Sequence, residues 1–291
     1  MNITKDDLKV MSFNILWKDI DSTAKNDATV TIKNPISNRI LQLNALLKGE
    51  HIDIAGLQEV SPKWVANLAT LDSDYAYVGS TTSNTREGGY MLYKKEKLEL
   101  LENSMFWLAE GAPTVSTKMD GAEFDRICSW AIFKIKETGN IFIFMDTHCD
   151  HVLPDDKKYT QGEILSDQVS VLQKMASEKY DVKGDCPLVL VGDMNAYMSN
   201  GLYKTITTKL NDARKCSVGT TVSEEYGTLT GGFHCYNDRQ EPEAKGVIID
   251  FIFVSDNISV NNFNMLHTTT NLCEYGEYIS DHNAITAELV F

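Results

Sequence analysis

The alternation of hydrophobic and polar positions along the chain predicts many short strands and few helices. Apolar residues recur at helical spacing over residues 36–47 and 161–180, which predicts two amphipathic helices. Residues 62–71 predict a third helix with Ser61 as N-cap and Pro62 at its first position, and residues 199–210 a weaker fourth. Runs rich in β-branched and aromatic residues predict strands over residues 8–15, 52–60, 75–79, 89–94, 98–108, 129–136, 141–147, 187–191, 247–254, 259–266 and 283–291.

This order of elements predicts an α/β fold in which two sheets pack face to face. A sheet must bury at least one apolar face, and helices that fall between strands cover the outer faces of such a pair. No linker rich in Gly, Pro or Ser divides the chain, so we expect a single domain over residues 1–291. Residues 211–245 are predicted to be mostly loop, and long loops on a rigid scaffold tend to carry function.

Five of the predicted strands contain, or are followed by, polar residues that carry useful chemistry, and a sixth such cluster directly precedes the final strand. Burying a carboxylate is costly unless it is paired or bound to a metal. Several carboxylates at strand ends therefore predict one shared site at one rim of the sandwich. The clusters are Asn14, Glu59, His148 with Asp150 and His151, Asp193 with Asn195, Asp250, and Asp281 with His282.

The donors in these clusters favour a hard divalent cation. Carboxylate and amide oxygens with few thiolates suit Mg²⁺ or Mn²⁺ better than zinc. Residues two apart on a strand face the same way, so Asp193 and Asn195 are expected to point together. The oxygen donors are Asn14, Glu59, Asp193, Asn195 and Asp281.

A histidine and a carboxylate from two of the clusters suggest acid–base chemistry. His282 beside Asp250 would form a base with an orienting carboxylate, which fixes the imidazole tautomer. Asp281 and His282 are adjacent, so a regular strand would point them apart. A loop just before the final strand could bring both to the site.

Each cluster also has a simpler interpretation. Residues 192–195 could form a turn, Asn14 could be a turn residue, and Glu59 could cap the following helix. His148 and His151 could be part of a zinc site, but a third ligand at short spacing is missing. The occurrence of all six clusters together favours a functional site over six separate structural roles.

The chain resembles the endonuclease/exonuclease/phosphatase family through these six motifs taken in order. The motifs are Ser-Phe-Asn14, Leu-Gln-Glu59, Thr-His148-Cys-Asp150-His151, Gly-Asp193-Met-Asn195, Ile-Asp250-Phe-Ile and Ser-Asp281-His282. The resemblance spans residues 8–291 and is closest to a bacterial subgroup of metal-dependent hydrolases. It implies a four-layer sandwich of two mostly antiparallel or mixed sheets, with helices on the outer faces.

The resemblance also implies that the reaction is hydrolysis of a phosphoester and that each oxygen donor has a separate role in it. Glu59 would bind the divalent metal, Mg²⁺ or Mn²⁺, with help from Asn14 and Asp281. Asp193 and Asn195 would hold the attacking water and the scissile phosphate.

Two further positions, Glu87 and Arg126, fit the family and complete the implied site. His148, supported by Glu87, would donate to a phosphoryl oxygen or to the leaving group. His282, oriented by Asp250, would be the general base or a charge-stabilising donor, so which histidine is the base stays open. Arg126 resembles a phosphate-contacting arginine that neutralises charge on the phosphoryl oxygens.

Charge and composition restrict the possible classes of substrate without identifying the substrate itself. The formal net charge of −14 argues against a tight, sequence-independent grip on nucleic acid, because phosphate neutralisation needs Lys and Arg. Carboxylates around a cation contribute to that charge, so a nucleic-acid substrate is not excluded. The substrate is expected to be a phosphoester, either nucleic acid or a small phosphorylated molecule. Alternatives are a lipid or sugar-phosphate phosphohydrolase and a catalytically silent module that binds a phosphorylated ligand.

Several aromatic residues are candidates for substrate contact. Tyr197, Phe233 and Tyr236 could stack on a base or pack on a sugar or lipid, and residues 231–233 could form a contacting segment. The segment after Asn195, Ala-Tyr-Met-Ser, lacks the arginine-bearing pattern of inositol-polyphosphate 5-phosphatases.

The remaining sequence features predict a cytoplasmic monomer without stable membrane association. No apolar run approaches the ~18 residues that span a bilayer, and residues 1–10 are too polar for a secretory signal. A signal removed from the chain would leave no trace. The six cysteines are widely spaced and form no C-x-x-C pair, so they are expected to be buried, reduced thiols.

Overall fold

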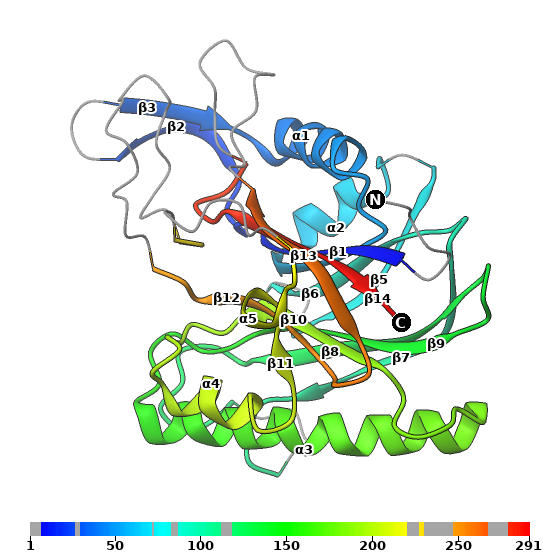
Figure 1. Cartoon of the computed structure of the whole chain (residues 1–291). Helices are drawn as coiled ribbons and strands as arrows, with labels where there is room; N and C mark the ends of the chain where they lie inside the picture. The colour runs from blue at the N-terminus through cyan, green and yellow to red at the C-terminus, as the bar shows by residue number, and fades with distance from the viewer. Residues whose placement is uncertain are drawn as a thin grey trace.

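The chain folds into two six-stranded sheets packed face to face, with helices on both outer faces (Figure 1). The computed structural model describes residues 7–26, 30–71, 73–82, 87–111, 118–219, 227–229, 247–266 and 279–291. The resulting four layers confirm the predicted α/β sandwich.

The first sheet contains both ends of the described chain and carries two helices on its outer face. Its only parallel pair in the described residues is β1 with β4, and its other pairs are antiparallel. The strand order is β13 (Ser259–Leu266), β14 (Ala284–Val290), β1 (Asp7–Asn14), β4 (Ile54–Val60), β6 (Gly88–Lys94) and β5 (Tyr75–Thr81), and the helices are α1 (Ile36–Gly49) and α2 (Pro62–Leu68).

The second sheet has the same plan, with one parallel pair among antiparallel ones. Strands β9 and β10 run parallel. The order is β11 (Asn211–Asp212), β12 (Asp250–Val254), β10 (Leu188–Asp193), β9 (Ile141–His148), β8 (Ile127–Ile135) and β7 (Leu98–Trp107). Helices α3 (Asp155–Tyr180) and α4 (Gly201–Ile206) cover its outer face, α5 (Ala213–Cys216) lies beside β12, and β2 (Ile20–Asn26) pairs with β3 (Val30–Asn34) as a separate ribbon.

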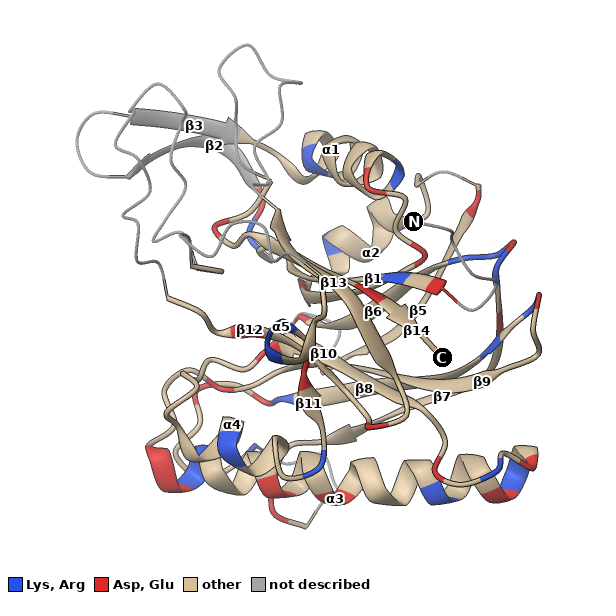
Figure 2. Ribbon diagram, viewed as in Figure 1, with Lys and Arg blue, Asp and Glu red and all other residues tan. Residues whose placement is uncertain are grey.

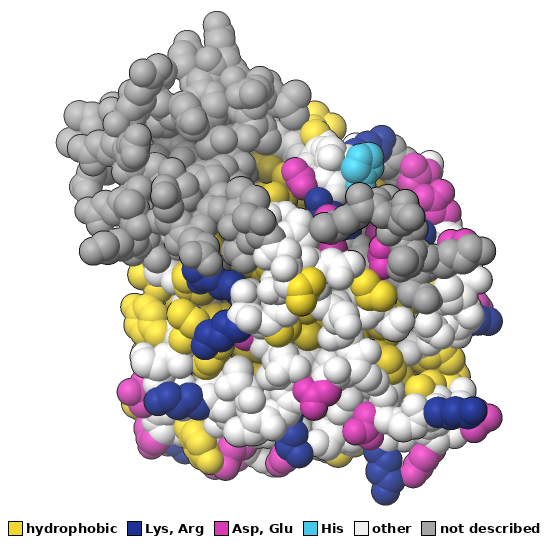
Figure 3. Space-filling view, viewed as in Figure 1, with side chains coloured by type: hydrophobic (Ala, Val, Ile, Leu, Met, Phe, Trp, Pro, Cys, Tyr) yellow, Lys and Arg dark blue, Asp and Glu magenta, His cyan; other side chains and the backbone are white. Residues whose placement is uncertain are grey.

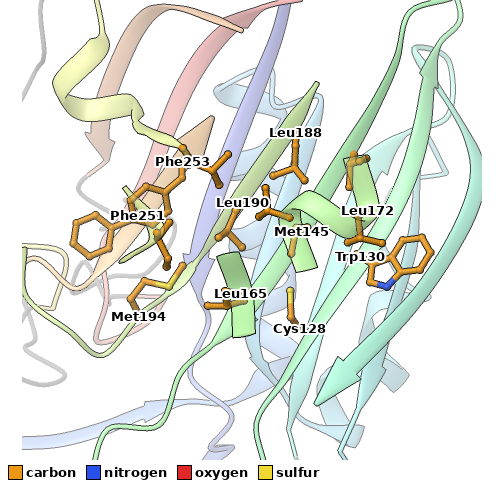
Figure 4. Close-up of a cluster of buried hydrophobic side chains, with 14 of the residues drawn as sticks. Cys128, Trp130, Met145, Leu165, Leu172, Leu188, Leu190, Met194, Phe251 and Phe253 are labelled. Carbon is orange, nitrogen blue, oxygen red and sulfur yellow. The ribbon is translucent and has the colours of Figure 1, made fainter. Parts of the chain in front are cut away.

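The central strands are apolar on both faces because both faces are buried. In β9, Phe142 and Phe144 belong to the core between the sheets. Ile143 and Met145 belong to the core cluster on the other face, with Leu165 of α3. Figure 4 shows Met145 and Leu165 in this cluster. This double burial explains why the strands appear in the sequence as continuous apolar runs.

The predicted elements are present, with differences where the sequence lacks apolar periodicity. Helix α3 begins at Asp155 rather than at residue 161, because its first turns are polar. Helix α4 is shorter than the predicted 199–210, and the β2–β3 ribbon was not predicted because its strands are polar. The predicted cap of α2 is present, since Ser61 Oγ accepts from the N–H of Trp64 at 3.5 Å.

Two expectations about solvent and membrane can be compared with the described residues. Cys128, Cys149 and Cys186 are buried free thiols, but Cys216 is exposed on the short α5, so its predicted burial was wrong. Cys235 and Cys273 lie outside the described residues. Within the described chain, no helix is both long and apolar enough to cross a bilayer. The long α3, for example, carries charges of both signs (Figure 2).

A carboxyl group lies between the two sheets, where the backbones approach closely. Asp146 of β9 is completely buried and accepts a hydrogen bond from Gln58 Nε2 at 2.6 Å. Burial raises the pKa of Asp146 well above its usual value. A Cβ on Gly56 would lie 2.3 Å from Val191 Cγ2 and 2.9 Å from Asp146 Oδ1. The absence of a side chain at Gly56 therefore allows this approach.

We expect Gly56→Ala to lower the free energy of unfolding by about 1–3 kcal/mol, because the added methyl group overpacks the space between the sheets. Urea denaturation measures the change. Gly49→Ala is the matched control: its Cβ would meet nothing within 4 Å at the end of α1. That variant should be neutral or more stable by up to about 1 kcal/mol. Equal stabilities of the two variants would contradict this account.

Candidate active site

A single pocket of about 520 Å³ gathers most of the predicted site residues from both sheets. Asn14 and Asp250 lie behind its wall, where they hydrogen-bond to residues that do line it. Asp281 is half-buried beside the pocket and is not among its lining residues. The predicted residues that line the pocket are Glu59, Glu87, Arg126, His148, His151, Asp193, Asn195 and His282.

The two parallel strand pairs explain why these residues meet. In the first sheet Asn14 lies opposite Gln58, so β1 and β4 end together next to Glu59. In the second sheet Asp193 lies opposite His148 at the ends of β10 and β9. The carboxyl ends of parallel strands share one edge of a sheet, where open α/β sheets usually bind ligands. The two sheets present these edges to the same pocket.

Asn14 joins the two sheets at this edge. Its Nδ2 donates to Glu59 Oε1 at 3.0 Å and to Asp193 Oδ2 at 3.1 Å. Its Oδ1 accepts from the N–H of Leu16 at 3.1 Å, so the turn interpretation also holds. The amide nitrogen, rather than the oxygen, therefore faces the two carboxylates.

Glu59 is a carboxylate whose charge is poorly compensated by the protein. Its Oε2 accepts from the N–H of Trp17 at 2.9 Å. Burial, with smaller contributions from Glu87 and Asp281, raises the pKa of Glu59 to about 7 despite the bonds from Trp17 and Asn14. The cluster would gain free energy by binding a cation.

Asp193 lies between the two histidines. Its Oδ2 is 3.5 Å from His148 Nε2 and 3.7 Å from His282 Nε2. Its Oδ1 accepts from the N–H of Asn195 at 2.9 Å. Burial and the neighbouring Asp250 raise the pKa of Asp193 to about 7, against the opposing effect of His282.

Asn195 does not share a strand with Asp193, contrary to the expectation from their spacing. Strand β10 ends at Asp193, and Asn195 follows in a left-handed conformation with φ of 45°. The turn brings its side chain back over the strand end, where Nδ2 is 2.9 Å from His148 Nε2 and donates to the carbonyl of Cys149 at 3.0 Å.

His282 and Asp250 are paired as the sequence suggested. His282 Nδ1 is 2.9 Å from Asp250 Oδ2. Burial alone would favour the neutral imidazole, but Asp250, Asp193 and Asp281 outweigh it and raise the pKa of His282 to about 10. His282 is therefore cationic at neutral pH.

His148 has the opposite electrostatic environment. Burial, with Arg126 next in effect, lowers the pKa of His148 well below its usual value. His148 Nδ1 is 3.7 Å from Glu87 Oε1, which is beyond hydrogen-bonding distance. Glu87 instead pairs with Arg126 Nη1 at 2.8 Å, and Arg126 Nε lies 3.7 Å from Asp150. The predicted support of His148 by Glu87 is therefore indirect in this arrangement.

Backbone strain is concentrated at the pocket. Among the described non-glycine residues with positive φ, Leu16 has φ of 54° and Glu59 has φ of 63°, and Asn195 is the third at the site. Such conformations are costly for residues with a Cβ and tend to occur at functional sites. No sequence signal marked Leu16, because only the folded loop requires this conformation.

The described residues contain two groups that could hold a metal, and His151 is in neither. The groups are Glu59, Glu87 and His148, and Asp193, Asp250 and His282. His151 lies 3.2 Å from Glu123 and stacks on Phe124 instead, so the zinc interpretation has no support here.

The aromatic residues at the pocket differ from those suggested by the sequence. Tyr197 is 58% exposed and does not line the pocket. Phe233, Tyr236 and residues 231–233 lie outside the described residues. Trp17 and Phe124, which the sequence did not single out, line the pocket.

Comparisons with known proteins agree with the fold and with the family resemblance. The family model described as "Endonuclease/Exonuclease/phosphatase family" matches residues 11–282. No curated protein matches the chain.

Solved structures match over nearly the whole length of this chain. A family protein from Bacteroides thetaiotaomicron has a TM-score of 0.81 at 24% identity, covering 98% of this chain and 95% of that one. A family protein from Bacteroides vulgatus has a TM-score of 0.76 at 27% identity, covering 97% and 98%. A mannosyl-6-phosphatase from Bacteroides thetaiotaomicron has a TM-score of 0.74 at 25% identity, covering 98% and 100%. The chain therefore belongs to the endonuclease/exonuclease/phosphatase family, whose members hydrolyse phosphoesters.

Proposed function

We propose that this protein is a divalent-metal-dependent phosphoester hydrolase. The observation that carries the proposal is the convergence of Glu59, Asp193 and His282 on one pocket, from strand ends that lie far apart in the sequence. A binding module without catalysis would not need a cationic histidine, a neutral histidine and a buried carboxylate around the same space.

Glu59 is the principal residue that would hold Mg²⁺ or Mn²⁺, with Asp281 beside it. Asn14 directs its amide nitrogen at Glu59, so it would have to turn its oxygen toward the cation to act as a ligand. The fit rests on the donor chemistry, which is dominated by oxygen, and on the raised pKa of Glu59 among like charges. When bound, the cation would act as a Lewis acid that stabilises negative charge on the phosphoryl oxygens.

The pKa values of the protein's own groups indicate which of them would accept a proton and which would donate one. Asp193, with a pKa of about 7, can accept a proton from the attacking water, and Asn195 helps to hold that water. His282 is cationic and can donate to a phosphoryl oxygen, while Asp250 keeps its ring oriented. Arg126 lines the same pocket and adds positive charge where the phosphate would lie.

We further propose that the substrate is a small sugar-phosphate ester. Phe124 and His151 stack with ring centroids 6.0 Å apart, and Arg126 lies over Phe124 at 5.3 Å, so this wall of the pocket is held in place. Aromatic rings pack well against the C–H faces of a sugar. The similarity to a mannosyl-6-phosphatase supports this class. On the face in Figure 3, basic and acidic side chains of the described residues are interspersed, which does not favour a polyanion.

The first expectation concerns stability rather than activity. The pKa of Glu59 is raised from 4.5 to about 7 in the folded protein, so its contribution to stability is present below pH 4.5 and is lost as the pH rises through 7. In EDTA, the Tm of the wild type should fall between pH 5 and 8, and Glu59→Gln should flatten this fall by several degrees. Mg²⁺ should raise the wild-type Tm at pH 8 more than that of Glu59→Gln. Parallel pH profiles would contradict the assignment.

The second expectation concerns turnover. Hydrolysis of mannose 6-phosphate, bis(p-nitrophenyl) phosphate and single-stranded nucleic acid should be compared with Mg²⁺ and with EDTA. Glu59→Gln and His282→Ala should each lower kcat/KM by about 10²–10⁴-fold, because metal binding and proton donation each contribute large factors.

Matched controls for these variants lie on the surface. Glu178→Gln, on the exposed face of α3, and His51→Ala, after α1, should keep wild-type activity. Equal rates with and without EDTA would disprove metal dependence, and absence of turnover on every substrate would favour the silent binding module.

The third expectation concerns the aromatic wall. Phe124→Ala should raise KM for a hexose 6-phosphate by about tenfold, because the ring loses its stacking surface, and should change KM for glycerol 3-phosphate by less than about twofold. Tyr197→Ala, an exposed aromatic outside the pocket, is the control and should change neither. Equal changes for both substrates would contradict a sugar-binding role of this wall.

A further inference from the structure

A completely buried arginine lies behind the active site. Arg39 of α1 has no exposed surface and is among the largest fully buried side chains. Arginine is almost never fully buried unless it is paired. Within the described residues, no ion pair joins Arg39 to a carboxylate, and its Nε has no hydrogen-bond partner. Its hydrogen bonds are made to backbone carbonyls instead.

The guanidinium binds backbone carbonyls of two segments that are distant in sequence. Nη1 donates to the carbonyls of Ile15 at 2.9 Å and Leu16 at 3.2 Å, and Nη2 donates to the carbonyl of Lys18. Nη1 also donates to the carbonyl of Ile279 at 3.3 Å. The planar fork of one side chain thus fastens the loop after β1 to the segment before β14.

The first of these segments, residues 15–18, reaches the site through a backbone N–H. Trp17, which lies between the carbonyls that Arg39 binds, donates its N–H to Glu59 Oε2 at 2.9 Å. Leu16 holds a left-handed conformation, and its carbonyl also accepts from Trp64 Nε1 of α2 at 2.9 Å. The guanidinium lies over the ring of the same Trp64 at 5.0 Å. The strained loop therefore depends on the helix layer for its shape.

The second segment, residues 279–282, leads directly to the catalytic histidine. Ser280 Oγ donates to the carbonyl of Asn14 at 2.6 Å and accepts from the N–H of His282 at 3.2 Å. The position of Ile279, which Arg39 fixes, therefore sets where this segment starts. His282 then extends to Asp250 and Asp193.

The charge of Arg39 also acts on the site. Burial lowers the pKa of Arg39 to about 10, against the opposing effects of Asp281 and Glu59. Arg39 is therefore still cationic at neutral pH, on the helix side of these carboxylates. Among the described residues this buried cation has no ion pair, and a buried charge is a poor source of stability because its desolvation is costly. A contribution to function would explain why the arginine occupies this position.

We propose that Arg39 is a positioning residue for the hydrolysis: it holds residues 15–18 and residues 279–282 so that the Trp17 N–H meets Glu59 and His282 meets Asp193. Arg39 does not line the pocket and does not touch substrate. The inference rests on the proposed function, and it goes further in assigning part of the catalytic geometry to the outer helix layer.

The variant Arg39→Met separates positioning from stability. Methionine fills much of the same volume without a charge, but it leaves the four backbone carbonyls without their donor, so the Tm should fall while the protein still folds. For this reason kcat is compared per folded molecule. The turnover number kcat should fall by about 10–100-fold with KM nearly unchanged, because small displacements of catalytic groups are costly to the rate. Arg39→Lys, which keeps the charge but loses the fork, should be intermediate. Arg214→Met, in α5, is the control and should keep wild-type kcat.

A rescue experiment tests the hydrogen bonds themselves. Arg39→Ala leaves a space of the shape of a guanidinium ion, so millimolar guanidinium should restore part of its kcat, whereas the same concentration of sodium chloride should not. A purely structural role predicts a different pattern: Arg39→Met would lose Tm while kcat per folded molecule stayed at the wild-type value. That result, or a wild-type kcat in a stable Arg39→Met, would overturn the inference.

Amide hydrogen exchange tests the positioning role of Arg39 without requiring that the proposed hydrolysis occurs. Arg39→Met should accelerate exchange at the amides of Trp17 and His282 and leave the amides of β10 unchanged. This outcome is measurable even if no substrate in the panel is turned over, which would count against the proposed hydrolysis alone. Unchanged exchange at both amides would overturn the role of Arg39 whatever the activity.

Discussion

The burial of several carboxylates where the ends of the two sheets meet is the constraint on which the rest of the site depends. Asp193 and Asp250 lie opposite each other on adjacent strands, and Glu59 approaches from the other sheet. Burying such charges together costs free energy unless other groups compensate. The Asn14 amide and the imidazolium of His282 compensate part of this negative charge. The negative charge that remains uncompensated makes the pocket suited to a cation.

The same constraint gives two histidines of one pocket opposite proton states. His282 is cationic because Asp250 contacts one ring nitrogen and Asp193 lies near the other. His148 is neutral because burial is reinforced by Arg126. Two groups with pKa values pushed apart can serve as different partners in proton transfer, which is how acid–base roles are usually separated at neutral pH.

The outer helices contribute to the site as well as to the core. Helix α2 reaches the loop after β1 through the indole of Trp64, and helix α1 reaches it through Arg39. The left-handed conformation of Leu16 is held by these contacts, since strain of this kind persists only where the surroundings enforce it. The edge that carries the candidate site is thus formed by strands, and the helix layer behind them holds its loop in place.

The sequence alone determined the layered fold and the clusters at the strand ends, because both leave local patterns: double burial makes apolar runs, and a polar residue at the end of such a run stands out. It also determined the cap of α2 and the pairing of His282 with Asp250. Only the tertiary structure decided that Asn14 bridges Glu59 and Asp193, that Arg126 rather than His148 pairs with Glu87, and that Arg39 binds two distant loops. These contacts join backbone carbonyls and residues far apart in the chain, and no local periodicity encodes them.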